Sequence, residues 1–171
     1  MRQLFSFKPT SMIAALLLAA CAVPARHDAG PRETWGFAAA SEAWPAKLIY
    51  GLDNTDVVSL GFTCHAGSGR AQIVVFVSEE EETWPERLEL HSGKARQTFD
   101  LIPPVQADLP VLNADIDPAS PLAAAFAQTG QLESTMGGVR RSLGAADNGE
   151  RRAVSDFWRS CVGDRSSKPN R

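Results

Sequence analysis

The alternation between Val58 and Cys64 constrains the fold of this chain more than any other feature of its sequence. Every second residue of this run is apolar or a cysteine, and the residues between them are small or polar. Because successive side chains point to opposite faces of a β-strand, the run predicts a strand with one buried face. Cys64 belongs to the buried set, so its sulfur is predicted to point into the core.

Further runs predict strands that pair mainly as hairpins. Residues 71–77 are apolar on both faces in their second half, which is typical of a central strand covered on both sides. The other candidates are short alternating runs bounded by turn residues: 47–52, 87–91 with 95–99, 112–116, and a weaker hairpin over 132–143.

Two segments predict helices. One begins at Pro121 and ends before Gly130, and the other begins after Asp147. The second segment places four residues on one helical face at positions i, i+3, i+4 and i+7: Val154, Phe157, Trp158 and Cys161. We therefore predict an α+β domain over residues 44–163, with an antiparallel sheet or small sandwich of five to seven strands and the C-terminal helix packed on one face. The polar tail 164–171 is predicted to be disordered.

The first twenty residues have the pattern of an export signal. Arg2 and Lys8 precede an apolar run from Met12 to Ala20, which is too short for the roughly 20 residues that a membrane-spanning helix needs. The run ends in Leu18-Ala19-Ala20-Cys21, which resembles the lipobox of bacterial lipoprotein precursors. The alternative is an ordinary signal peptide followed by an incidental cysteine.

The lipobox resemblance implies that residues 1–20 are removed and that Cys21 is acylated. By the sorting tendency of that family, Ala22 favours the outer membrane, with the domain facing the periplasm. Residues 21–43 show no sustained period and contain several glycines and prolines, so they are predicted to form a tether. Trp35 and Phe37 are expected to dock on the edge of the domain.

Once Cys21 is assigned to lipid by this resemblance, Cys64 and Cys161 are the two cysteines that remain. An exported chain matures in an oxidising compartment, so we predict a disulfide between them. Strand periodicity and helix periodicity place both sulfurs in the core. The alternatives are two unrelated buried thiols, or Cys64 as a nucleophile beside His65. The second is disfavoured because adjacent strand residues point to opposite faces.

Composition and motifs exclude several functions. Loss of Arg2 and Lys8 would leave 15 of the 17 basic residues against 20 acidic ones, which disfavours a nucleic-acid ligand. The serine-hydrolase motif Gly-x-Ser-x-Gly is missing, and the three histidines lack zinc-ligand spacing. We predict neither a metal nor another cofactor. Glu79, Glu80, Glu81 and Glu82 are expected to form a solvated acidic loop that could contact a partner.

The C-terminal pattern also resembles small proteobacterial envelope proteins, such as type VI secretion accessory proteins and invasion-associated periplasmic proteins. The pattern consists of the helix with Leu122 and Phe126, a glycine-bounded hairpin, and then Val154, Phe157 and Cys161. This resemblance carries over no catalytic residue. We therefore expect a non-catalytic, outer-membrane-anchored lipoprotein that binds a protein partner or serves envelope assembly. The alternatives are an inhibitor of an enzyme such as lysozyme, whose basic surface the acidic loop could engage, and an envelope hydrolase with dispersed carboxylates.

Overall fold

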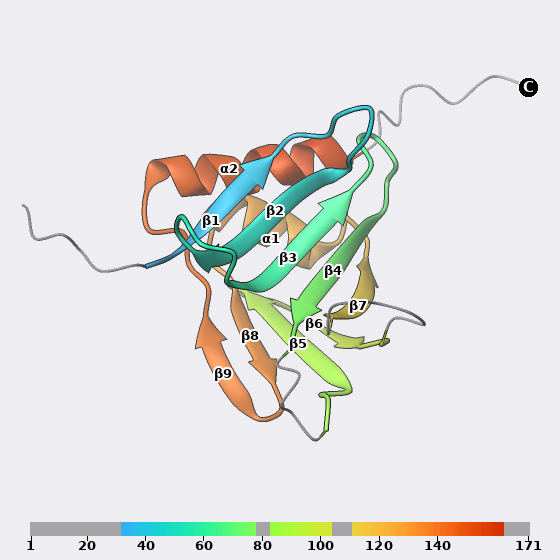
Figure 1. Ribbon diagram of the computed structural model, residues 1–171, viewed down its shortest axis with the longest axis vertical. Helices are drawn as coiled ribbons and strands as arrows, with labels where there is room; N and C mark the ends of the chain where they lie inside the picture. The colour runs from blue at the N-terminus through green and yellow to red at the C-terminus, as the bar shows by residue number, and fades with distance from the viewer. Residues whose placement is uncertain (1–31, 78–82, 104–110, 163–171) are drawn as a thin grey trace, which may run out of the picture.

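Nine strands and two helices form the described part of the chain, which is residues 32–77, 83–103 and 111–162 of a computed structural model (Figure 1). The predicted signal peptide, Cys21, the acidic loop Glu79 to Glu82 and the tail 164–171 lie outside these ranges. The predictions made for those residues therefore stay predictions.

The first sheet, sheet A, has five antiparallel strands in the order β1-β2-β3-β4-β7. Their bounds are β1 Glu33–Ala38, β2 Ala46–Leu52, β3 Val58–Cys64, β4 Ala71–Phe76 and β7 Val111–Ile116. Strand β3 confirms the predicted alternation, because Leu60, Phe62 and Cys64 are all buried. β3 is also the middle strand, so its inward side chains lie at the centre of the core.

The second sheet, sheet B, has four antiparallel strands in the order β6-β5-β8-β9. Their bounds are β5 Arg87–Ser92, β6 Ala95–Asp100, β8 Glu133–Met136 and β9 Val139–Ser142. Both predicted hairpins are confirmed, as β5 with β6 and β8 with β9. Backbone hydrogen bonds of 2.9 Å between Ile102 and Asn113 join the chain after β6 to β7 of sheet A.

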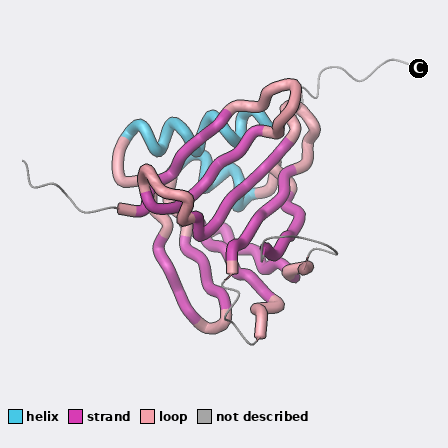
Figure 2. Tube along the Cα trace, in the orientation of Figure 1, coloured by secondary structure: helices cyan, strands magenta, loops and turns pink. Residues whose placement is uncertain are grey.

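The two helices, α1 Pro121–Thr129 and α2 Asn148–Cys161, lie behind sheet A (Figure 2). Ser120 caps α1 by accepting a hydrogen bond from the Ala123 N–H, and Gly130 ends the helix in the left-handed conformation, with φ of 66°. Helix α2 packs against β1, β2 and α1. The α+β class, the antiparallel pairing and the packed C-terminal helix are therefore confirmed, with nine strands in the described residues instead of five to seven.

Aromatic side chains from five elements, β1, β2, β3, α1 and α2, fill the core between sheet A and the helices. Phe62 of β3 contacts Phe126 of α1 and Trp158 of α2, with ring centroids 6.0 and 5.3 Å apart. The predicted inward face of α2 is buried throughout. Cys64 and Cys161 form the predicted disulfide, with their Cα atoms 5.7 Å apart. This bond fixes the end of α2 to the middle strand of sheet A.

The tether prediction is wrong for residues 33–38, which form β1. Trp35 is only 3% exposed, and its ring lies 4.9 Å from that of Tyr50 and 5.1 Å from that of Phe126. Its indole N–H donates to the backbone oxygen of Leu143 at 2.8 Å. These partners are distant in sequence, so the local pattern could not reveal the strand. The folded region therefore includes Glu33 and does not begin at residue 44.

The prediction that β4 is covered on both faces is also wrong. Gln72 is exposed, and Phe76 is 37% exposed. Both helices lie on one side of sheet A, so the opposite face of β4 is left open to solvent (Figure 1). An apolar run in a strand therefore did not imply a second covering layer.

Candidate functional site

A groove of about 490 Å³ opens between the two sheets. Leu60 and Val75 line it from sheet A, and Leu88 lines it from sheet B. All three side chains are almost fully buried, so the base of the groove is apolar and belongs to the packed core. Volumes of about 300–1,000 Å³ with mostly apolar walls are typical of small-molecule sites.

Large apolar side chains are exposed at the rim of this groove. Trp84, which precedes β5, is 42% exposed, and Val139 at the start of β9 is 64% exposed. Met136, at the end of β8, is half-buried beside them. Single exposed apolar residues are common on protein surfaces, whereas a group of them around a concavity is typical of an interaction surface.

A polar cluster lies beside the groove, where the edge strands of the two sheets meet. The Ser59 hydroxyl donates to Glu33 Oε1 at 2.9 Å, and Arg141 Nη2 donates to the same oxygen at 2.7 Å. These residues come from β3, β1 and β9. Arg141 is half-exposed and lines the groove, so the Glu33 contact holds a guanidinium in place at the groove wall.

The phenol of Tyr50 lies within electrostatic reach of the same cluster. Burial raises the pKa of Tyr50, the negative charge of Glu33 raises it further, and Arg141 lowers it. The phenol is therefore a neutral hydroxyl at physiological pH.

The described lining of the groove offers apolar contact and one positive charge. Arg141 is its sole charged residue, and the described lining contains no histidine, cysteine or carboxylate. Glycoside cleavage normally requires two carboxylates flanking the bond, and this part of the groove does not supply that pair. What the arrangement can do is bind a ligand with an apolar body and an anionic group.

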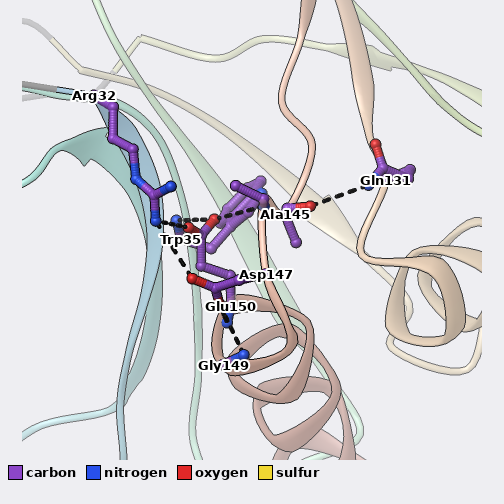
Figure 3. A network of polar contacts seen from close by, with 8 residues as sticks. Arg32, Trp35, Gln131, Ala145, Asp147, Gly149 and Glu150 are labelled. Carbon is purple, nitrogen blue, oxygen red and sulfur yellow. Dashed lines mark hydrogen bonds and ion pairs between the residues drawn. The ribbon is translucent and has the colours of Figure 1, made fainter. Parts of the chain in front are cut away.

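A second polar network, centred on buried Glu150, joins β1 to the start of α2 (Figure 3). Glu150 Oε2 accepts hydrogen bonds from the backbone N–H groups of Trp35 and Ala146, at 3.3 and 3.2 Å. Its other oxygen lies 3.0 Å from Arg32 Nη2. Because both oxygens are occupied by contacts within the fold, we assign Glu150 a structural role.

The residues around Glu150 extend this network along the beginning of α2. Asp147 accepts from the backbone N–H groups of Gly149 and Glu150, at 2.8 and 3.0 Å, and so caps the helix. The hydrogen bond from Glu150 is the main cause of the lowered pKa of Asp147, with those from Gly149 and Arg32 adding to it. Figure 3 also shows Gln131 donating to the backbone oxygen of Ala145, at 3.3 Å.

The structure brings together one set of sequence-predicted residues, Cys64 and Cys161, as a bond inside the core. Cys21 and the four glutamates lie outside the described residues. Sequence reasoning missed the groove and its Arg141. The available signal was the weakly apolar hairpin over 132–143, whose apolar residues Met136 and Val139 flank two glycines and are followed by Arg141.

The described residues contain no cluster of three or more His, Cys, Asp or Glu side chains that could hold a metal ion. Neither helix in the described part of the chain is long and apolar enough to cross a membrane. Comparison with protein-family models, with curated proteins and with solved structures found no match to this chain.

Proposed function

We propose that this chain is an exported lipoprotein with a non-catalytic binding or accessory role in the cell envelope. Lipid on Cys21 anchors it to the outer membrane, and its domain faces the periplasm. The apolar run before the lipobox supports export. The disulfide between Cys64 and Cys161 supports it independently, because such bonds form and persist mainly in oxidising compartments.

The groove between the two sheets carries the binding part of this proposal. It combines a buried apolar floor with an exposed apolar rim at Trp84 and Val139. Exposed apolar surface of this kind is disfavoured in water unless it is covered during function. The groove is therefore the surface through which the domain binds.

Cell fractionation tests the anchor. The unaltered protein should sediment with outer membranes, and its mass should match a chain that begins at Cys21 and carries acyl groups. Cys21→Ser should release the protein into the soluble fraction, whereas Ala22→Asp should move it to the inner membrane. Continued membrane association of the Cys21→Ser protein would contradict the lipid anchor.

A neutral apolar dye, N-phenyl-1-naphthylamine, tests the groove. Dye fluorescence should rise saturably with the protein, and Val139→Glu should reduce this binding at least tenfold by placing a charge at the rim. Val57→Glu is the matched control, because Val57 is 55% exposed and does not line the groove. Equal dye binding by both variants would show that the groove is not the site.

A further inference from the structure

We propose that the groove binds a single-chain fatty acid, with its acyl chain along the apolar lining and its carboxylate on Arg141. This inference rests on the proposed function, because it names the ligand of the same groove. Two observations carry it, the size of the groove and the charge of its lining, and the proposed lipid anchor on Cys21 agrees with it.

The volume of the groove matches one acyl chain. A dry apolar cavity of about 150 Å³ accommodates a benzene molecule with its six carbon atoms. A groove of about 490 Å³ therefore has room for on the order of twenty carbon atoms. That space accommodates one acyl chain and is too small for both chains of a phospholipid at once. A protein partner would need a larger surface than this groove. The described lining comprises thirteen residues, whereas a stable protein interface uses about 20–30 residues on each side.

Arg141 is the residue of the described lining that can pair with an anionic head group, beside its contact with Glu33. Arg141 presents a planar fork of five N–H donors, and within the described chain one nitrogen, Nη2, is engaged by Glu33. The remaining donors suit a carboxylate, which arginine binds in a bidentate manner. Because Glu33 is itself held by Ser59, the guanidinium is positioned at the groove wall before a ligand arrives.

The proposed anchor on Cys21 would keep the groove near a source of fatty acids. Cys21 and Glu33 are twelve residues apart, and even a fully extended chain of that length spans only about 40 Å. Glu33 belongs to the polar cluster beside the groove. A lipid on Cys21 would therefore keep this cluster within about 40 Å of the membrane surface, where free fatty acids concentrate.

Ligand titration of the full chain carrying Cys21→Ser tests the inference without detergent, because this variant cannot be acylated. Palmitate, kept below its aggregation concentration, should displace N-phenyl-1-naphthylamine with one-to-one stoichiometry and shift the tryptophan emission to the blue. Trp84→Phe should abolish that shift, whereas Trp44→Phe should keep it, because Trp44 is exposed and does not line the groove. Each two methylenes added between decanoate and palmitate should tighten binding by up to about 15-fold.

Two variants of one ion pair test the head group. Arg141→Gln should weaken palmitate binding by about 10- to 100-fold, the range for a charge-assisted hydrogen bond, and should leave hexadecanol binding unchanged. Glu33→Gln keeps an oxygen for Ser59 and Arg141 but removes a competing negative charge, so palmitate should bind as tightly or more tightly. If both variants weaken palmitate and hexadecanol equally, Arg141 only stabilises the fold and the inference is wrong.

Failure of this inference differs from failure of the proposed function. Groove-dependent dye binding that palmitate does not displace would overturn the fatty-acid assignment and leave the groove as a binding site. Dye binding that Val139→Glu does not reduce would overturn the groove itself. Binding only of vesicles that contain a two-chain phospholipid would identify a membrane-contact surface and would also overturn the assignment.

Discussion

Replacement of Glu150 by alanine should destabilise the protein by about 1–4 kcal/mol. The Trp35 N–H, on a residue only 3% exposed, would lose its acceptor, and an unsatisfied buried donor costs about 1–3 kcal/mol. Ala146 is exposed, so water can replace the carboxylate at its N–H. Loss of the half-exposed Arg32 ion pair adds less than about 1 kcal/mol.

Glu150→Gln is the matched control for this prediction. The glutamine keeps an oxygen for the Trp35 and Ala146 N–H groups, but its NH2 group replaces the oxygen that accepts from Arg32. Because Arg32 is half-exposed and water can accept its hydrogen bond, the expected loss is about 1 kcal/mol. Guanidinium chloride unfolding followed by circular dichroism measures both variants. The slope of the transition should be unchanged, because the core is intact in both proteins.

The thermal midpoint should fall by about 3–16 °C for Glu150→Ala, because 1 kcal/mol shifts a domain of this size by roughly 3–4 °C. A loss below 1 kcal/mol for Glu150→Ala, or equal losses for both variants, would refute the reasoning. Either result would mean that the carboxylate does not bind β1 to α2 through its oxygens.

Three further predictions concern the stability of the fold. Replacement of Cys64 and Cys161 by alanine should lower the free energy of unfolding by about 4–5 kcal/mol, because the disulfide closes a loop across 97 positions. A mass of the non-reduced, unaltered protein that corresponds to free thiols at both cysteines would contradict the disulfide. Folding lowers the pKa of Asp147 from its ordinary 3.8. The stabilisation that the Asp147 carboxylate gives to the folded protein is therefore present above pH 3.8 and is lost as the pH falls through the folded-state pKa. The stability difference between the unaltered protein and Asp147→Ala should therefore shrink in strong acid, and a difference independent of pH would argue against this role of the carboxylate. Gly51→Ala should cost about 1–3 kcal/mol, because an added Cβ would lie 2.3 Å from a backbone oxygen, whereas Gly36→Ala meets nothing within 4 Å and should be neutral.

Strand and helix periodicity predicted much of the fold because burial imposes its own repeat on a local sequence. The alternation through Cys64 and the helical repeat through Cys161 each identified a buried face, and the structure joins these faces by a disulfide. Turn residues likewise marked both hairpins of sheet B. In each case the information lay within a few residues of the element, where neighbours set the geometry.

Features that depend on distant partners were not predictable in this way. Residues 33–38 have no strong alternation of their own, and they form β1 because Trp35 packs against Phe126 and bonds to Leu143. The open face of β4 follows from the placement of both helices on the other side of sheet A.

The sequence alone determined the repeating patterns, the pair of core cysteines and the expectation of export and lipid anchoring. Only the tertiary structure decided that β1 belongs to the sheet, that Glu150 is buried and that Arg141 meets Glu33 beside an apolar groove. The physical reason is that a periodic pattern reports which side of an element is buried and does not report what lies against it. A binding groove is made by residues far apart in the chain, so it exists only once the sheets have packed.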